Sequence, residues 1–243
     1  MRQREARGRV RLVLNDNPAL MLERYDHLSL EYVLNVPSDA RPSDSRPLVM
    51  VLHGRGADMN DLADIAPMLD RGGYRFVFPN APHPFEPYPG MTVGRSWFDG
   101  WPPTRASLDD SRSRLLQFID EIAGRLQTPP GKIIISGFSQ GGVMSFDAAF
   151  RTKQTLAGIV CMSGAIFENE VPAPATWPRL PVLIVHGTAD DMIPVFAARR
   201  ARRFLESSGL EPEYHEFDMG HHVTPESLHV VAAFIERAFT GHP

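Results

Sequence analysis

Short apolar runs alternate with amphipathic stretches along most of this chain. Apolar runs rich in β-branched residues are typical of buried strands, and we expect strands at residues 48–52, 75–78, 132–136, 156–162, 182–186 and 213–217. Apolar residues at helical spacing predict helices between them, at about residues 60–69, 108–126, 143–150, 197–207 and 225–239. Alternating strands and helices predict an α/β fold, in which helices cover both faces of a mostly parallel central sheet.

The beginning of the chain has a different pattern. Residues 27–36 resemble an antiparallel lead-in strand, residues 10–14 are a candidate for another, and residues 38–47 are polar and contain prolines, as a loop does. The sequence shows no linker and no internal repeat. We therefore predict one domain over residues 1–243, with lead-in strands and a loop at 1–47 and the core at 48–243.

Two stretches, residues 80–104 and 163–181, have no regular pattern and are rich in prolines and aromatic residues. Each leaves a predicted strand at its carboxyl end, which is where α/β sheets bind their ligands. Long structured loops in a compact domain are often functional. We expect these loops to shape a binding site, with the alternative that their aromatic side chains only cover the sheet.

Composition and charge narrow the class of protein. A formal net charge of −4 over 243 residues argues against a nucleic-acid-binding protein, which is usually basic. Cys161 is the only cysteine, so no intramolecular disulfide can form, and its apolar surroundings indicate a buried structural thiol. No apolar stretch is long enough to span a bilayer, and the arginine-rich start lacks the apolar core of a secretory signal. These features predict a cytoplasmic protein.

The segment 137–141 reads Gly-Phe-Ser-Gln-Gly and joins a predicted strand to a predicted helix. A serine on such a sharp turn has a strained backbone, and the residues two positions away on each side must lack bulk, which explains Gly137 and Gly141. The turn lifts the Ser139 hydroxyl out of the sheet, where it can attack a carbonyl carbon. A glycine-rich turn can also be only a tight connection, so the interpretation depends on the rest of the chain.

A serine hydroxyl is a weak nucleophile unless a base takes its proton and an acid orients that base. The acid is expected just after a later strand, where Asp190 follows residues 182–186 and Asp191 competes with it. The base is expected after the last strand, where His221 follows residues 213–217 and His222 is the alternative. Ser139, Asp190 and His221 thus each follow a strand, in the order that this kind of machinery requires.

The negative charge that develops on an attacked carbonyl oxygen must also be held by N–H donors. We expect one donor to be the Gln140 backbone N–H, which follows the nucleophile in the turn. The other is expected from the glycine-rich segment after residues 48–52, and we assign the Arg55 backbone N–H. The Arg55 side chain is a separate matter, since it can face solvent or attract anionic substrates.

Together, several segments resemble the phospholipase/carboxylesterase family of α/β-hydrolases, which includes carboxylesterases, lysophospholipases and acyl-protein thioesterases. These are Leu-His-Gly-Arg-Gly-Ala-Asp at 52–58, Ser-Trp-Phe-Asp at 96–99, Gly-Phe-Ser-Gln-Gly-Gly at 137–142, His-Gly-Thr-Ala-Asp at 186–190 with Ile-Pro at 193–194, and Gly-His at 220–221. The resemblance implies an α/β-hydrolase fold with no separate cap domain and no cofactor. It also implies a triad of Ser139, Asp190 and His221, oxyanion N–H groups from Arg55 and Gln140, and a place near the acyl group for Trp97.

The remaining substrate contacts are expected from the two irregular loops and from the residues beside Asp190. The candidates are Phe98, Phe167, Met192 and Ile193.

These features predict a serine carboxylesterase that hydrolyses short- to medium-chain esters through an acyl-serine intermediate. The alternatives are an acyl thioesterase or lysophospholipase acting on longer acyl groups, a peptidase of the same fold, and a non-catalytic ligand-binding member of the fold. A metal hydrolase is disfavoured, because the histidines, His53 and His186 among them, lack the spacing of known metal ligands. The expected partner is a small acyl ester, with no nucleic acid, no membrane span and no bound metal or cofactor. A homodimer is left open.

Overall fold

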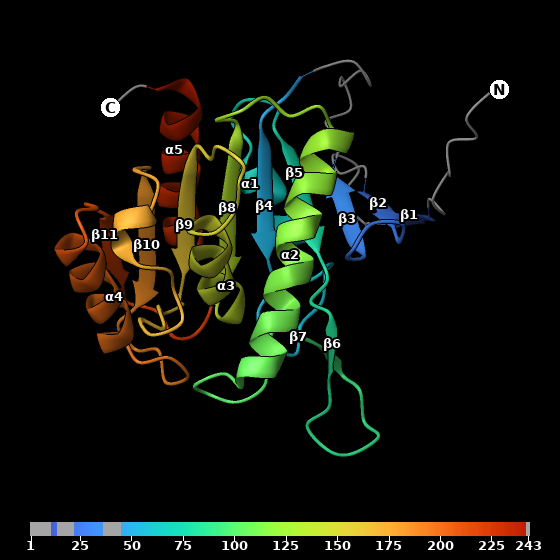
Figure 1. Ribbon diagram of the computed structural model, residues 1–243, viewed down its shortest axis with the longest axis horizontal. Coiled ribbons are helices and arrows are strands. Elements are labelled where there is room, and N and C mark those ends of the chain that lie inside the picture. The colour runs from blue at the N-terminus through green and yellow to red at the C-terminus, as the bar shows by residue number, and fades with distance from the viewer. Residues whose placement is uncertain (1–10, 14–21, 36–44, 242–243) are drawn as a thin grey trace.

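A computed structural model describes residues 11–13, 22–35 and 45–241 (Figure 1). Its main sheet has nine strands in the described part of the chain, in the order β1-β2-β3-β5-β4-β8-β9-β10-β11. The strands are β1 Arg11–Val13, β2 Leu22–Tyr25, β3 Tyr32–Asn35, β4 Leu48–Leu52, β5 Arg75–Pro79, β8 Ile133–Phe138, β9 Gly158–Met162, β10 Val182–Gly187 and β11 Glu213–Phe217. From β5 to β11 neighbouring strands are parallel, whereas β1, β2 and β3 pair antiparallel with each other and β3 pairs antiparallel with β5.

The central parallel strands are buried at nearly every position, as the continuous apolar runs predicted. In β4, β5, β9 and β10 every residue is buried, whereas the residues of β11, at the edge of the sheet, are only partly buried. The prediction of an α/β fold with a mostly parallel central sheet is therefore confirmed.

Helices cover both faces of this sheet (Figure 1). On one face, buried side chains of α2 (Arg105–Arg125), α3 (Gln140–Ala149) and α4 (Phe196–Ser207) share one apolar cluster with alternate strand residues. On the other face, α1 (Ala66–Leu69) and α5 (Pro225–Thr240) contribute to a second cluster. The sheet thus separates two cores and fixes the positions of the loops at its edges.

The lead-in region differs from its prediction. The antiparallel strand expected at residues 27–36 is present but begins later, because residues 27–30 are bends and the strand is Tyr32–Asn35. Its antiparallel partner, Leu22–Tyr25, lies earlier in the chain, and Arg11–Val13 pairs with that strand in turn. Strands of three or four residues are too short to show a reliable alternation of apolar and polar positions.

The helix expected at residues 60–69 is also shorter than predicted. A 3₁₀ turn at Ala63–Ile65 leads into the four-residue α1. Before it, the carboxylate of Asp58 accepts a hydrogen bond from the Asn60 backbone N–H at 2.8 Å. This local bond stabilises a turn where the pattern indicated the start of a helix.

The stretch 80–104, expected to be irregular, contains a small antiparallel hairpin of β6 (His83–Phe85) and β7 (Gly94–Ser96). The loop that joins these strands projects beyond the rest of the molecule at the lower edge of Figure 1. β6 contains a proline, which argues against a strand, and each strand has only three residues, so the residue pattern did not predict the hairpin.

Strands β4, β8, β10 and β11 are parallel and end at the same edge of the sheet. The loops that follow them come very close together. A Cβ atom placed on Gly187, at the end of β10, would lie 2.2 Å from the carbonyl oxygen of Met219 in the loop after β11. Only glycine allows this approach, which brings the loop that carries Asp190 against the loop that carries His221.

Candidate functional site

The turn between β8 and α3 has the strained geometry that its sequence predicts. Ser139 has φ 57° and ψ −120°, a conformation that non-glycine residues rarely adopt. A Cβ atom on Gly137 would lie 2.1 Å from the Gly141 carbonyl oxygen, and one on Gly141 would lie 2.1 Å from the Leu52 carbonyl oxygen. Both glycines are therefore required by close backbone contacts, and the second contact presses the start of α3 against the end of β4.

The Ser139 hydroxyl is linked to His221 and Asp190 by two hydrogen bonds. The Ser139 Oγ to His221 Nε2 distance is 2.9 Å, and the His221 Nδ1 to Asp190 Oδ2 distance is 2.7 Å. A carboxylate only accepts hydrogen bonds, so the proton of the neutral imidazole lies on Nδ1 and leaves Nε2 free to accept the hydroxyl proton. Ser139 and Asp190 are buried, and His221 is partly buried.

Asp190 is fixed by the backbone of its own loop. Its Oδ1 atom accepts hydrogen bonds from the backbone N–H groups of Met192 at 3.0 Å and Ile193 at 2.8 Å, which leaves Oδ2 for His221. The competing candidates, Asp191 and His222, are both exposed. The contacts therefore favour Asp190 over Asp191 and His221 over His222.

The loop after β4 packs directly against the serine. A Cβ atom on Gly54 would lie 3.3 Å from the Ser139 Cβ. In the described part of the chain, the backbone N–H groups of Arg55 and Gln140 donate to no protein acceptor, and the latter lies at the N-terminus of α3, where a helix presents free N–H groups. The loop is held by the hairpin, since Gly56 N–H donates to Arg95 O and Arg95 N–H donates to Ala57 O, both at 2.8 Å.

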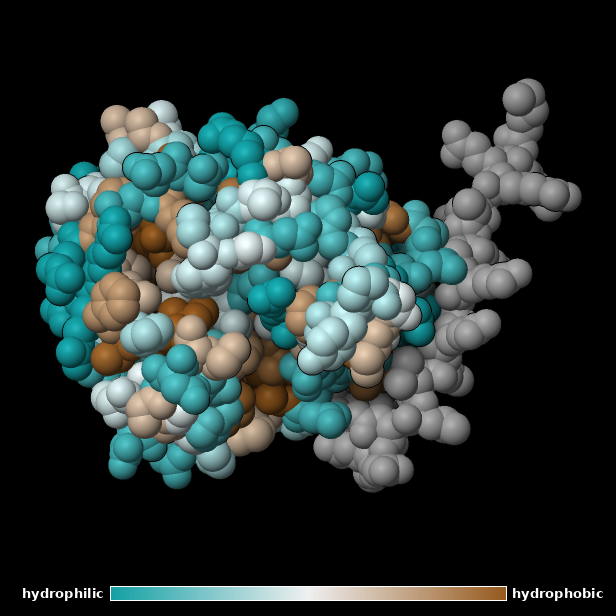
Figure 2. Space-filling view, turned by 90° about the horizontal axis from the view of Figure 1, so that it is seen from below, coloured by the Kyte–Doolittle hydropathy of each residue, from teal (hydrophilic) through white to brown (hydrophobic). Residues whose placement is uncertain are grey.

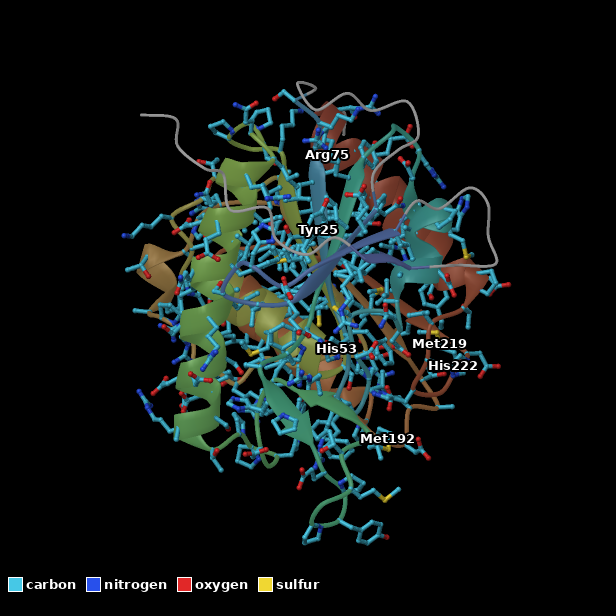
Figure 3. All side chains as sticks on the ribbon, turned by 90° about the vertical axis from the view of Figure 1, so that its right-hand side faces the viewer. Tyr25, His53, Arg75, Met192, Met219 and His222 are labelled. Carbon is cyan, nitrogen blue, oxygen red and sulfur yellow. The ribbon has the colours of Figure 1, made fainter. Side chains whose placement is uncertain are left out.

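His53 supports this loop from the interior, and Figure 3 shows it near the centre of the view, whereas Met192 and His222 lie towards the edge. Its Nε2 atom accepts the Ala81 backbone N–H at 3.0 Å, and its Nδ1 atom lies 2.7 Å from the Gly54 carbonyl oxygen. Burial lowers the pKa of His53 to about 4, so the ring is neutral at pH 7. Nδ1 therefore carries the proton, and one neutral ring connects two loops.

The side chain of Gln140 performs a similar supporting role from the other side. Its Oε1 atom accepts from the Trp97 backbone N–H at 3.0 Å, and its Nε2 atom donates to the Phe98 carbonyl oxygen at 2.8 Å. The Trp97 indole N–H donates to the His53 carbonyl oxygen at 2.9 Å. Trp97 and Phe98 have no exposed surface. They can contact a substrate only after a neighbour moves, so their assignment to substrate binding stays a prediction.

The other predicted substrate contacts lie at different depths. Phe167 is partly buried and packs edge-on against Phe98 and Trp101, with ring centroids 6.0 Å and 4.9 Å away. Ile193 is buried, whereas Met192 is 71% exposed. Figure 2 views the molecule from the side where the carboxyl ends of the parallel strands lie, and it shows brown hydrophobic patches among hydrophilic side chains. The roles of Phe167, Met192 and Ile193 in substrate binding therefore stay predictions.

The Arg55 side chain packs against the β6–β7 hairpin. It is exposed, and its guanidinium lies 4.6 Å from the centroid of the Phe85 ring in the hairpin. The arrangement is a cation–π contact with the loop after β5. The candidate oxyanion donor of Arg55 is therefore its backbone N–H and not its side chain.

Two supporting histidines escaped the sequence interpretation, which considered His53 and His186 only as metal ligands. Each lies at or just after the end of a fully apolar strand and directly before a glycine. That position is a usable signal, because a histidine there must be buried and hydrogen-bonded to backbone groups. Within the described residues, no group of three or more His, Cys, Asp or Glu side chains is arranged to hold a metal ion.

Cys161 is buried, and burial raises the pKa of its thiol to about 12. Its sulfur would lie 2.6 Å from a Cβ atom placed on Gly164, so it fills space behind the loop after β9. Among the helices that the structure describes, none combines the length and apolar character needed to cross a membrane.

Comparison with known proteins agrees with this geometry. The sequence model of the phospholipase/carboxylesterase family matches residues 36–239. Acyl-protein thioesterase 1 of Mycosarcoma maydis is 28% identical, covering 84% of this chain and 95% of its own, and carboxylesterase SOBER1 of Arabidopsis thaliana is 30% identical, covering 68% and 78%. The crystal structure of esterase PE8 is similar with a TM-score of 0.72 and 28% identity, covering 82% of this chain and 95% of its own.

Proposed function

Since this chain belongs to the phospholipase/carboxylesterase family of α/β-hydrolases, we propose that it is a serine carboxylesterase that hydrolyses short- to medium-chain esters. The observation that carries the proposal is the hydrogen-bonded series from Ser139 through His221 to Asp190. The relatives named as carboxylesterases and esterases support the same reaction class.

In the proposed first half-reaction, Ser139 Oγ attacks the ester carbonyl carbon while its proton passes to His221 Nε2. The carbonyl oxygen becomes negatively charged and is held by the backbone N–H groups of Arg55 and Gln140. The bond to the alkoxy group then breaks, and the alcohol leaves with the proton from His221. The acyl group remains on Ser139.

In the second half-reaction, water attacks the acyl carbon and gives its proton to His221. The carboxylic acid is released when the bond to Ser139 Oγ breaks and the proton returns to the serine oxygen. Asp190 accepts the Nδ1–H of His221 throughout and stabilises the imidazolium that forms in each half-reaction. The buried position of Asp190 strengthens this interaction, because little solvent screens it.

The test is a pair of serine variants. Ser139→Ala should lower kcat for p-nitrophenyl butyrate by on the order of 10⁴-fold or more, since removing a nucleophile leaves only binding and oxyanion stabilisation. The matched control is Ser163→Ala, because Ser163 is also buried, follows a strand and has a positive φ. It should keep wild-type kcat. A fluorophosphonate should label the wild type and the control and leave the Ser139 variant unmodified; turnover retained in that variant would falsify the assignment.

A second candidate is hydrolysis of longer acyl groups or of thioesters, which the similarity to an acyl-protein thioesterase favours. The two candidates share every step above and differ in the acyl group and leaving atom. Acetyl, octanoyl and palmitoyl esters, each compared with the thioester of the same acyl group, separate them by kcat/KM. The primary proposal expects kcat/KM to be largest for the acetyl and octanoyl oxygen esters.

A further inference from the structure

His186 is a buried side chain that the mechanism above does not use. It lies in β10, four residues before Asp190, and has no exposed surface. Its Nε2 atom lies 2.7 Å from the Ile193 carbonyl oxygen and 3.4 Å from Asp190 Oδ2. One ring therefore reaches across the loop that carries the acid and touches both the loop backbone and the carboxylate.

The protonation state of this ring follows from its neighbours. A carbonyl oxygen and a carboxylate only accept hydrogen bonds, so Nε2 must carry the proton. Burial lowers the pKa of His186, so the ring is neutral, and its unprotonated Nδ1 has no partner in the described part of the chain. An unpartnered buried nitrogen costs stability, and a leucine or methionine would avoid that cost.

The two hydrogen bonds of Ile193 show what the ring does. The Ile193 backbone N–H donates to Asp190 Oδ1 at 2.8 Å, while the Ile193 carbonyl oxygen accepts from His186. Ile193 is thus held from both sides, by the carboxylate and by the imidazole. The His186 bond thus holds the Ile193 carbonyl group, directly after the N–H group that donates to Asp190 Oδ1.

The opposite side of the acid loop is anchored differently. The Ala189 N–H donates to the Met219 carbonyl oxygen at 3.1 Å, and the Thr188 N–H donates to the Phe217 carbonyl oxygen at 2.8 Å. These backbone bonds tie the start of the loop to the segment that carries His221. At the end of the loop, His186 bonds to the Ile193 carbonyl oxygen, and the Pro194 carbonyl oxygen accepts the Ala197 N–H at 2.8 Å.

We propose that His186 is a positioning residue, whose Nε2–H holds the Ile193 carbonyl so that the Asp190 carboxylate stays aligned with His221. This inference rests on the proposed function, because alignment matters only if His221 acts as the base. His186 touches no reacting atom. Its effect passes through Ile193 and Asp190.

The experiment compares two substitutions that keep different parts of the ring. The amide nitrogen of His186→Gln reaches the position of Nε2 and can still donate to Ile193, whereas the shorter amide of His186→Asn reaches only the position of Nδ1. H186N should lower kcat by on the order of 10- to 100-fold with KM little changed, as a small displacement of a catalytic group does. H186Q should restore kcat to within about threefold of the wild type.

Leu183→Ala serves as the control for general destabilisation. Leu183 is buried in the same strand as His186, and it belongs to the apolar cluster that α1 and α5 cover. This variant should lower the unfolding temperature while its kcat, measured well below that temperature, stays at the wild-type value. If kcat of H186N falls no further than that of L183A at matched stability, His186 has only a structural role and the proposal is overturned. Equal kcat losses in H186Q and H186N overturn it too, since the Nε2 donor would then be irrelevant.

A spectroscopic readout separates this inference from the proposed function. The Nδ1 proton of His221, bonded to Asp190, should give a far-downfield proton NMR resonance that Asp190→Asn removes. We expect H186N to shift or broaden this resonance and H186Q to retain it. An unchanged resonance in H186N refutes the positioning role, whereas activity that survives Ser139→Ala refutes the esterase proposal.

Discussion

Ser139 and Ser163 occupy equivalent places at the ends of neighbouring strands. Both are buried, and both have positive φ, 57° and 47°. Each backbone N–H donates to a carbonyl oxygen of the next strand, Ser139 to Met162 and Ser163 to Val185, both at 2.9 Å. Their hydroxyl groups differ, because Ser139 Oγ meets His221 and Ser163 Oγ has no partner among the described residues.

The difference lies in what surrounds each turn. After Ser139 the chain enters α3 at once, so the helix N-terminus and the loop after β4 both lie beside the hydroxyl. After Ser163 the chain continues without a helix, and Gly164 packs on Cys161. Backbone strain is therefore present at both serines and does not by itself make a nucleophile. Among the described residues, a histidine ring and a helix N-terminus adjoin the hydroxyl of Ser139, and neither adjoins that of Ser163.

The largest difference between the two serines should come from changing Asp190, whose carboxylate contacts His221 and through it Ser139. Asp190→Asn should lower kcat by on the order of 10⁴-fold, because an amide nitrogen can donate to His221 Nδ1 and favour the wrong tautomer. Asp191→Asn is the matched control, since Asp191 is adjacent but exposed, and it should leave kcat unchanged. Steady-state kinetics on p-nitrophenyl butyrate decide the point, and similar losses in both variants would show that Asp190 is not the acid.

The glycines beside the two serines should respond differently to an added methyl group. In Gly141→Ala the Cβ meets the Leu52 carbonyl oxygen at 2.1 Å, a backbone atom that cannot move without disturbing β4. We expect a loss of about 3 kcal/mol or more in the free energy of unfolding, at the upper end of overpacking effects. In Gly164→Ala the nearest atom is the Cys161 sulfur, at 2.6 Å.

The closest obstacle is thus a side chain, with backbone atoms of Gly142 next at 3.1 Å, so Cys161→Ala should rescue most of the loss in Gly164→Ala and none of the loss in Gly141→Ala. Urea unfolding of the wild type, the three single variants and the two double variants measures the two coupling energies. A rescue of both, or of neither, would mean that the two turns are constrained in the same way.

Because His53 is buried and its pKa is lowered, we expect the stability of the protein to depend on pH. Protonating His53 costs free energy in the folded state, because burial lowers its pKa to about 4 from 6.5. Between these values the unfolded chain binds more protons, so the stability that is present above pH 6.5 is lost as the pH falls towards 4. The loss from this group amounts to about 3 kcal/mol.

His53→Gln isolates this effect, because its amide oxygen can still accept the Ala81 N–H but does not titrate. The free energy of unfolding in urea, measured at pH 7 and pH 4, should fall by about 3 kcal/mol more in the wild type than in the variant. His186, also with a lowered pKa, is present in both proteins and cancels in the comparison. Parallel losses in the two proteins would exclude His53 as the source.

Features that depend on order along the chain were predictable from the sequence. The apolar runs gave the parallel strands, and Ser139, Asp190 and His221 were chosen because each follows one. The contacts that hold these residues were not predictable, since His53 bonds to Ala81 and His186 bonds to the backbone of Ile193. Such bonds depend on which backbone groups the fold leaves unpaired, and no residue pattern records that. The β6–β7 hairpin was missed because both strands are short and β6 contains a proline.

The smallest expected effect concerns Arg55, where the proposed role belongs to the backbone. Its side chain is exposed and lies over Phe85, so Arg55→Ala should remove a cation–π contact of about 0.5–1 kcal/mol and keep the N–H. We therefore expect kcat for a neutral ester to stay within about threefold of the wild type, because an oxyanion donor is lost only when its N–H is lost. An ester with an anionic acyl group provides the contrast. A kcat/KM that falls only for the anionic ester would assign the guanidinium to substrate attraction, whereas a large loss of kcat on the neutral ester would contradict the backbone role.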